Sequence, residues 1–361
     1  MNKTEYYRNI RADLHRHPGV SGDEEYAHDL IVGELKKLHP KELYIHVGGW
    51  GVVAVWPSTR QDAKTLAFRA DIDALPSGHR CGHDGHTAIL LRFAQMVDAD
   101  NDRRNNIVLI FQPEEETGKG AKKIMQIGIL QRLGVDAIFG LHNLPGYDKG
   151  TVVLSRGTFA AASCGVIYRF IGRQTHASTP ENGVNPDLAI AQMIECMAEQ
   201  NRVNSKNFKL STLICCKIGD EAFGTAAGEG EVMFTLRSST SQGMIELMKV
   251  ADTKAIELSE RYGLKLEKQM REPFKAVENS PDIADRMALL FAAKCRTKIL
   301  TSPMRWSEDF AEYLKEFRGV FFGLGSGRNQ PGLHSPDYVF PDDIIEAGAK
   351  SFETIMNGIN L

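Results

Sequence analysis

The feature that most constrains the fold is an alternation of short apolar runs with amphipathic stretches along the first half of the chain. The run NIVLIFQP at 106–113 is short and continuous, as in an interior strand of a mostly parallel sheet. Similar runs at 50–56, 65–73 and 136–142 predict further strands, and the amphipathic stretches between them predict helices. The alternation therefore predicts an α/β fold in which helices cover both faces of a mostly parallel sheet.

The middle of the chain follows a different order. Its patterns predict, in sequence, a strand at 164–172, a helix at 186–201, strands at 210–218 and 230–237, a helix at 242–262 and a strand at 264–270. That order is the split βαβ pattern of a small α+β, ferredoxin-like domain. We therefore expect a discontinuous α/β domain formed by residues 1–162 and 273–361, interrupted by an inserted domain formed by residues 163–272.

The composition narrows the classes of partner and compartment. Lys and Arg number 43 against 46 Asp and Glu in 361 residues, so no basic excess exists to hold a nucleic acid or an anionic membrane. No apolar run approaches the roughly 20 residues that span a bilayer. The N-terminal segment has no apolar signal core, and six cysteines in a chain of this length do not suggest a disulfide scaffold. We therefore expect a cytoplasmic protein without nucleic-acid or membrane partners.

A polar cluster with metal-binding chemistry lies at 79–86, HRCGHDGH. Cys81 and His83 stand two residues apart before a predicted helix, so a thiolate and an imidazole can point at one ion. Thiolate, imidazole and carboxylate are all ordinary zinc ligands. The alternative is a solvated polar loop with an incidental buried cysteine, but three histidines beside one cysteine are far above background.

Further candidate ligands follow or close other predicted strands, where open α/β sheets build their sites. The acidic run Glu114–Glu116 follows the strand at 106–113, and like charges there need a cation to offset their repulsion. One carboxylate can then bind metal while its neighbour holds a proton. His142 and His334 are weaker signals, because a lone histidine is more often structural.

Two more segments offer supporting groups. Asp71 and Asp73 end the strand at 65–73, and a carboxylate there suits the second N–H of a metal-bound imidazole. A turn or helix-cap aspartate is an equally good interpretation of either one. His176 lies in the inserted domain, far from the other candidates in sequence, and a plain surface histidine is the alternative.

Together and in order, these segments resemble the hippurate hydrolase and N-acyl-amino-acid amidohydrolase family of dinuclear-metal peptidases, which includes hydrolases of indoleacetyl–amino acid conjugates. The resemblance runs over nearly the whole chain, through LHRHPGVSGDE, FRADIDALP, HRCGHDGHTAILL, IFQPEEETGKGAKKI, GLHNLP, HASTPENGVNP, SEDFAEYL and LHSP. CGHDGHT with the downstream Glu-Glu pair is its most specific part. The chain departs from the family pattern at Gly224, where many relatives carry an asparagine that helps to hold the substrate carbonyl.

The resemblance implies a metal centre with two divalent ions per chain. Cys81 takes the place of the ligand that bridges the two ions, and His83, Glu116, His142 and His334 complete the two adjacent sites. The donor set suits zinc or manganese, with cobalt and nickel as alternatives, because affinity order alone does not choose among them.

The resemblance also implies roles for three residues that do not bind metal. Glu115 matches the general base, and Asp73 matches the carboxylate that orients a ligand histidine. His176 matches a histidine that reaches the substrate carbonyl from the inserted domain. In such proteins the inserted domain is a lid that also forms a dimer interface, so we expect a homodimer.

The implied activity is metal-dependent hydrolysis of the amide bond of N-acyl amino acids, by a metal-activated water and a glutamate base. A dipeptidase or aminopeptidase of the same family is the first alternative, and it differs in whether the substrate carries a free α-amine. A catalytically degenerate, metal-binding protein is the second. Structural zinc sites hold four protein ligands and no base, so a spare glutamate beside Glu116 favours catalysis.

Overall fold

The computed structural model describes residues 3–203 and 206–361, and the chain divides into two compact units. Unit 1 runs up to Phe159 and also contains Val277–Thr301 and Asp309–Leu361. Unit 2 contains Ala160–Ala276 and Ser302–Glu308. Each unit encloses its own cluster of buried apolar side chains.

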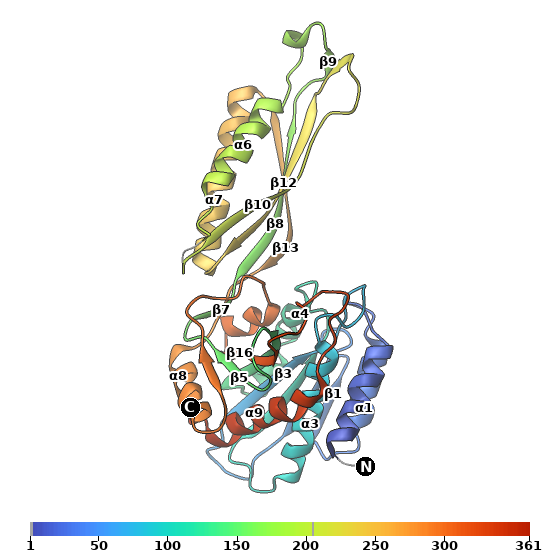
Figure 1. The fold of residues 1–361 in the computed structure, drawn as a ribbon, viewed down its shortest axis with the longest axis vertical. Helices are drawn as coiled ribbons and strands as arrows, with labels where there is room; N and C mark the ends of the chain where they lie inside the picture. The colour runs from blue at the N-terminus through green and yellow to red at the C-terminus, as the bar shows by residue number, and fades with distance from the viewer. Residues whose placement is uncertain (1–2, 204–205) are drawn as a thin grey trace. The chain divides into compact units, whose positions relative to one another are not determined.

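Unit 1 is built around an eight-stranded sheet (Figure 1). In spatial order its strands are β1 (Glu42–Ile45), β2 (Val52–Trp56), β4 (Asn106–Gln112), β3 (Thr65–Asp71), β5 (Ala137–Pro145), β16 (Arg318–Gly327), β6 (Val152–Leu154) and β15 (Thr297–Ile299). The central run β4-β3-β5-β16 is parallel, as is the β6–β15 pair, whereas the β1–β2, β2–β4 and β16–β6 pairs are antiparallel. The predicted α/β fold with a mostly parallel sheet is confirmed.

Helices cover both faces of this sheet. One face packs against α1 (Lys3–Arg16), α2 (Glu25–Leu35), α3 (His83–Ala99), α8 (Pro281–Ala292) and α9 (Ile345–Gly358), which follows the 3-10 helix η3 (Asp342–Ile344). The other face is covered by α4 (Gly120–Ile127), α5 (Ile129–Arg132) and the 3-10 helix η2 (Asp309–Lys315). Because side chains alternate along a strand, Phe68 faces the first layer and its neighbour Arg69 faces the second.

The parallel register brings the carboxyl ends of three neighbouring strands to one edge of the sheet. Asp71, the last residue of β3, pairs with Gln112, the last residue of β4. On its other side β3 pairs in parallel with β5, which continues to Pro145. The segments that follow these ends carry most of the candidate ligands, as expected for an open α/β sheet.

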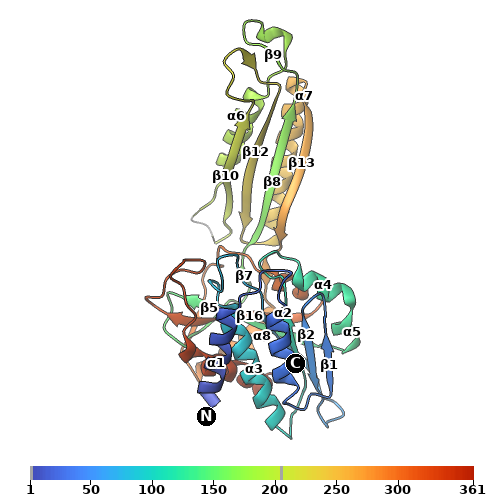
Figure 2. The same ribbon diagram turned by 90° about the vertical axis from the view of Figure 1, so that its right-hand side faces the viewer.

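Unit 2 contains a four-stranded antiparallel sheet with the spatial order β10 (Lys209–Ile218), β12 (Glu229–Ser238), β8 (Ala162–Ile171) and β13 (Lys265–Phe274). The helices α6 (Asp187–Glu199) and α7 (Ser241–Tyr262) lie against one face (Figures 1 and 2). In chain order the elements alternate as in the predicted split βαβ unit. Short additions to unit 2 are η1 (Pro180–Asn182) and the strand pair of β9 (Thr175–His176) with β11 (Thr225–Ala226). A second short pair, β7 (Thr158–Ala160) with β14 (Val277–Glu278), falls at the boundaries of unit 1 along the chain.

One predicted element needs correction, and one helix was not predicted. The sequence pattern at 308–316 predicts a helix, and the structure has the 3-10 helix η2 there, in which Phe310 and Tyr313, three residues apart, are both fully buried. Side chains at that spacing share one face of a 3-10 helix, so the tighter turn buries both rings. The N-terminal helix α1 was not predicted, because its buried stripe is narrow and lies within a polar segment.

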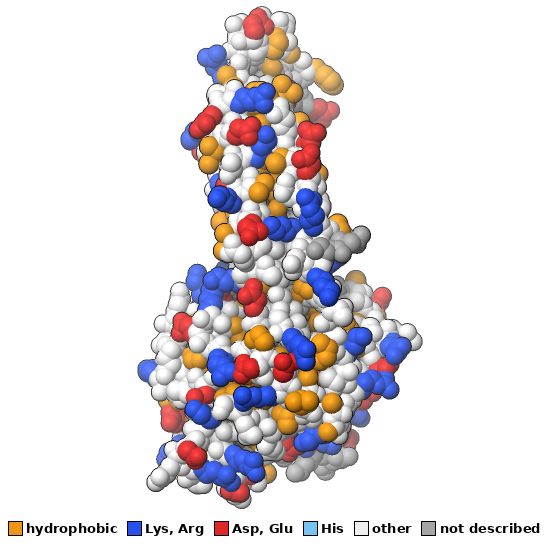
Figure 3. Space-filling view, turned by 90° about the vertical axis from the view of Figure 1, so that its left-hand side faces the viewer, with side chains coloured by type: hydrophobic (Ala, Val, Ile, Leu, Met, Phe, Trp, Pro, Cys, Tyr) orange, Lys and Arg blue, Asp and Glu red, His pale blue; other side chains and the backbone are white. Residues whose placement is uncertain are grey.

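No helix among the described residues is long and apolar enough to cross a membrane. On the face drawn in Figure 3, Lys and Arg side chains are interspersed with Asp and Glu side chains. This mixing agrees with the near balance of 43 basic and 46 acidic residues.

Candidate metal centre

The loop between β3 and α3 carries the first two candidate ligands. Cys81 is 7% exposed, and His83, the first residue of α3, is fully buried. Gly82 between them has a φ of 98°, and a Cβ there would lie 2.5 Å from Oδ1 of Asn143. Only glycine adopts this conformation without strain. The turn at Gly82 therefore lets two side chains that are two residues apart serve one site.

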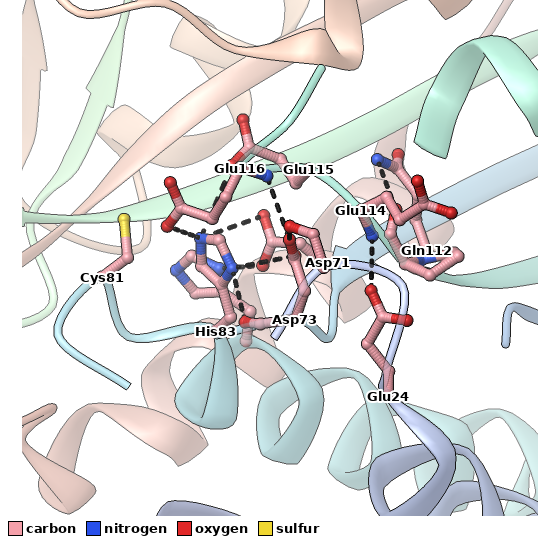
Figure 4. A network of polar contacts seen from close by, with 12 residues as sticks. Glu24, Asp71, Asp73, Cys81, His83, Gln112, Glu114, Glu115 and Glu116 are labelled. Atoms are coloured by element: carbon pink, nitrogen blue, oxygen red, sulfur yellow. Dashed lines mark hydrogen bonds and ion pairs between the residues drawn. The ribbon is translucent and has the colours of Figure 1, made fainter. Parts of the chain in front are cut away.

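The loop after β4 carries three carboxylates, of which one points away from the other two (Figure 4). Oε1 of Glu116 lies 3.8 Å from Nε2 of His83, and Oε2 of Glu115 lies 3.9 Å from the same nitrogen. Glu114 instead pairs with Lys123 and has a φ of 53°, which is uncommon for a residue other than glycine. The strained backbone at Glu114 thus separates one carboxylate from the two that face His83.

All five predicted ligands come together in two groups. Ligand atoms of Cys81, His83 and His142 lie within 4.8 Å of one another, and so do ligand atoms of Cys81, Glu116 and His334. Within the first group, Sγ of Cys81 lies 3.5 Å from Nε2 of His142. Cys81 belongs to both groups, which is the position that a bridging ligand must have.

His334 reaches this centre from a distant part of the chain. Its backbone N–H donates to the carbonyl oxygen of Arg80 at 2.9 Å, which ties its loop to the loop of Cys81. Nε2 of His334 lies 3.9 Å from Oε1 of Glu116, and its side chain is 55% exposed. His334 is therefore the most accessible of the five.

Two buried atoms that face each other in the centre have no hydrogen-bond partner. They are Nε2 of His83 and Oε1 of Glu116. Buried polar atoms are almost always bonded, and an unpaired one costs about 1–3 kcal/mol. A divalent cation would satisfy both atoms, and it is the species that nitrogen, oxygen and sulfur donors so placed bind in proteins. The residues present therefore fit a metal ion.

Asp73 holds the opposite side of the His83 ring. Nδ1 of His83 lies 3.0 Å from the carbonyl oxygen of Asp73 and 3.3 Å from its Oδ1. Oδ2 of Asp73 accepts hydrogen bonds from the Ser21 hydroxyl at 2.6 Å and from the Glu116 backbone N–H at 3.0 Å. Metal-binding imidazoles usually donate their second N–H to such an oxygen. Asp73 thus orients His83 and also connects the two ligand loops.

A third histidine of the cluster, His86, is close to the centre but has both ring nitrogens engaged. Its Nδ1 lies 2.5 Å from Oδ1 of Asp71, and its Nε2 accepts the backbone N–H of Asn143 at 3.1 Å. Asp71, His83 and His86 also lie close enough to hold an ion. Because His86 already has two bonded nitrogens, we assign it to the support of the centre and not to the ligand set.

Burial and charge set the protonation of the metal-free centre. Burial raises the pKa of the Cys81 thiol well above its usual value and raises the pKa of Glu116 to about 7. Burial alone would lower the pKa of His83, but the charge of Asp71 raises it well above its usual value. Burial holds the pKa of His142 well below its usual value. A metal ion must therefore displace protons from this centre.

The remaining predicted residue, His176, belongs to unit 2. It lies exposed on β9, and its Nδ1 is 2.7 Å from the Ser178 hydroxyl. Its role at the carbonyl of a substrate stays a prediction. Sequence reasoning missed Arg69 and Asp309, whose buried side chains form an ion pair at 3.0 Å. A charged residue inside the apolar strand β3 was the available signal for Arg69.

A mostly parallel α/β sheet with thiol, imidazole and carboxylate groups gathered at its carboxyl edge fits a metal-dependent hydrolase. The model of peptidase family M20/M25/M40 matches residues 67–358, and the chain belongs to that family.

Relatives of this family match the chain over almost its full length. It is 27% identical to a hippurate hydrolase of Campylobacter jejuni, with 96% of this chain and 94% of the relative covered. It is 26% identical to an uncharacterized hydrolase of Staphylococcus aureus, with 99% of each chain covered. A structure described as a dinuclear metal binding M20 peptidase, the YXEP protein of Bacillus subtilis, has the same fold, with a TM-score of 0.85, 23% identity and coverage of 98% and 97%.

Proposed function

We propose that this protein hydrolyses the amide bond of N-acyl amino acids with two divalent metal ions bound per chain. Cys81, His83, Glu116, His142 and His334 would hold the ions, and Cys81 would be the residue common to both ligand sets. The grouping of these five residues into two sets that share Cys81 supports two sites and not one. The likeness to a hippurate hydrolase supports an N-acyl amino acid as the substrate.

The observation that carries the proposal is the second carboxylate at the centre. Glu115 is buried, and its Oε2 lies 3.9 Å from the same His83 nitrogen that faces Glu116. A closed structural metal site has no use for a further carboxylate that is not a ligand. A hydrolase needs such a group, because water must lose a proton as it attacks.

The chemistry divides between the ions and the chain. When bound, the ions supply a Lewis acid that polarises the substrate carbonyl and lowers the pKa of a water. Glu115 accepts a proton from the attacking water and later delivers it to the leaving nitrogen. Asp73 keeps His83 oriented through its Nδ1. His176, from unit 2, donates a hydrogen bond to the oxygen that gains charge.

We propose that unit 2 is the lid and the dimer interface, and that unit 1 is the catalytic domain. β10 is an edge strand of the unit 2 sheet, and its Leu213 and Ile214 are 43% and 59% exposed. An exposed apolar edge strand is a template for pairing with a second strand, so a second copy of this chain is the partner that fits. The substitution Ile214→Lys should reduce the mass measured by light scattering to that of a monomer. Leu289→Lys, at an exposed site on α8 in unit 1, should leave it unchanged.

A hydrolysis assay tests the activity. The purified protein is chelated, then supplied with zinc, manganese, cobalt or nickel and offered N-acetyl and N-benzoyl amino acids together with simple dipeptides. Metal-dependent release of amino acid from the acyl compounds is the expected result. Release from dipeptides alone would assign the chain to the peptidase alternative, and two bound metals with no release would indicate a binding protein.

Glu115→Gln and Glu114→Gln form a matched pair for the assigned base. Glu115→Gln should bind metal normally and lose at least about a hundredfold in turnover, because the amide cannot accept the proton of water. Glu114→Gln should keep its activity, since that side chain contacts Lys123 instead. Full activity in Glu115→Gln would refute the assignment.

A further inference from the structure

Arg69 is a buried cation that the proposed chemistry does not use. It lies in β3 and is 1% exposed. Its guanidinium donates to three residues: to Oδ2 of Asp71 at 2.7 Å, to Oε1 of Gln112 at 2.8 Å and to Oδ1 of Asp309 at 3.0 Å. A buried charge is tolerated only when it is paired and hydrogen-bonded, and this one joins the ends of β3 and β4 to η2.

One arm of this network leads from Arg69 to the ligand His142. Oδ2 of Asp71 accepts a hydrogen bond from Arg69, and Oδ1 of Asp71 lies 2.5 Å from Nδ1 of His86. His86 in turn accepts the backbone N–H of Asn143, the residue after His142. The His86 and His142 rings meet edge to face, with centroids 4.6 Å apart. The orientation of Asp71 thus determines where His86, and with it His142, can lie.

The other arm leads to the loop that carries Glu115 and Glu116. Asp309, held by Arg69, accepts from Nε2 of Gln112 at 2.8 Å and from the backbone N–H of Ala121 at 2.9 Å. Gln112 is the residue before that loop, and Ala121 is in the first turn of α4, directly after it. The Arg69–Asp309 pair therefore fastens both ends of the loop.

We propose that Arg69 is a positioning residue for the metal centre, acting on His142 through Asp71 and His86 and on the Glu115–Glu116 loop through Asp309. This inference rests on the proposed metal centre. The role requires an arginine, because the planar guanidinium presents several N–H donors in a fixed fork. A lysine at this position keeps the charge but cannot reach three separate acceptors with the same geometry.

The test compares Arg69→Lys with Arg92→Lys as a matched control. Arg92 lies on α3 in the same unit and donates to both carboxylate oxygens of Glu346, away from the candidate ligands. Chelated wild-type and variant proteins are titrated with zinc alone, and the thermal unfolding of each metal-free form is recorded. The absorption spectrum of each cobalt-loaded form reports the ligand geometry, and kcat and KM are measured on the substrate found for the wild type.

We expect Arg69→Lys to weaken zinc binding by about tenfold or more, the usual effect of removing a group that orients ligands. Its cobalt spectrum should shift, and kcat should fall with little change in KM. Arg92→Lys should match the wild type in zinc affinity, spectrum and kcat. If Arg69→Lys keeps the wild-type zinc affinity and cobalt spectrum, and differs only in thermal stability, Arg69 is merely structural and the inference is wrong.

Asp309→Asn repeats the test from the other end of the ion pair and decides it if Arg69→Lys does not fold. The amide turns a donor toward the N–H groups of Arg69, Gln112 or Ala121, so zinc affinity and spectrum should change in the same direction. Wild-type values in this variant would overturn the inference. Zinc binding by the wild type without hydrolysis would refute the proposed activity alone, whereas absence of metal binding would refute both proposals.

Discussion

Nε2 of His83 and Oε1 of Glu116 face each other across 3.8 Å, and neither atom has a hydrogen-bond partner. Each sits at the end of a different segment, His83 at the start of α3 and Glu116 in the loop after β4. Two buried polar groups without partners destabilise a folded protein unless a bound ion satisfies both of them. The pair therefore links the occupancy of the metal centre to the stability of unit 1.

Zinc should raise the melting temperature of the chelated protein. A ligand that binds only the folded state at a hundred times its dissociation constant adds about 2.7 kcal/mol of stability. In Glu116→Gln, whose amide is a poor metal ligand, most of this increase should be lost, whereas Glu114→Gln should retain it. Thermal unfolding followed by circular dichroism with and without zinc makes the measurement. An equal increase in all three proteins would contradict the assignment of Glu116.

Metal binding should release protons and strengthen as the pH rises. Burial raises the pKa of Cys81 well above its usual value, so the metal-free protein carries a thiol there at neutral pH. Only the thiolate binds metal, so the proton must leave, and the affinity for zinc grows as the pH rises toward the raised pKa of the thiol. Zinc titration calorimetry in two buffers of different ionisation enthalpy counts the protons. Cys81→Ser should release fewer protons and bind zinc more weakly, and an unchanged proton count would exclude the thiol as a ligand.

Glu24 should make the metal-free protein less stable as the pH rises from about 4.5 to 7. Burial raises the pKa of Glu24 from 4.5 to about 7, although it accepts the backbone N–H groups of Gly22 and Glu114. Between these values the folded state holds a proton that the unfolded state has lost, so stability falls with rising pH. Glu24→Gln should reduce this slope. Glu25→Gln, at the exposed neighbouring position, should keep the wild-type slope.

Urea unfolding of the chelated proteins at several pH values measures the effect. Glu116 also has a pKa raised to about 7, so the slope in Glu24→Gln should be smaller but not zero. Parallel curves for the wild type and Glu24→Gln would show that Glu24 titrates at its ordinary pKa when folded.

Gly82→Ala should impair both stability and zinc binding. Gly82 and Gly78 have positive φ values of 98° and 93°, but only at Gly82 would a Cβ meet another side chain, 2.5 Å from Oδ1 of Asn143. Gly78→Ala therefore isolates the cost of the left-handed backbone, about 1–2 kcal/mol. Gly82→Ala should cost more and weaken zinc binding, because Cys81 and His83 flank it. Equal stability in the two variants, with wild-type zinc binding, would contradict this role.

The central strands of the sheet were predictable because strand patterns are local, whereas the strand order was not predicted. The continuous apolar run at 106–113 became β4, buried in the interior of the sheet between β2 and β3. Helix α1 was not predicted, since Tyr7, Ile10 and Leu14 are the only buried apolar side chains described in its mostly polar sequence. Its stability comes from packing on the core, and no local pattern reports that packing.

The candidate ligands could be predicted from their residue types. The hydrogen bonds and ion pairs that hold the ligands in place could not be predicted from the sequence. Cys81 and His83 stand two residues apart in the sequence, and their chemistry alone suggests a metal. The bond between Arg69 and Asp309 joins residues 240 positions apart, and no spacing rule relates them. Asp71 and His86 had ambiguous roles until their 2.5 Å contact showed that they bind each other.

The sequence by itself determined the α/β class, the split βαβ order of unit 2 and the donor groups available for metal, because each depends on residue type and on periodicity along a short segment. Only the tertiary structure decided which donors meet, which buried atoms are left without partners and which charges hold the ligand loops. Those properties arise where the ends of β3, β4 and β5 and the loop of His334 converge, and convergence depends on how distant segments pack together.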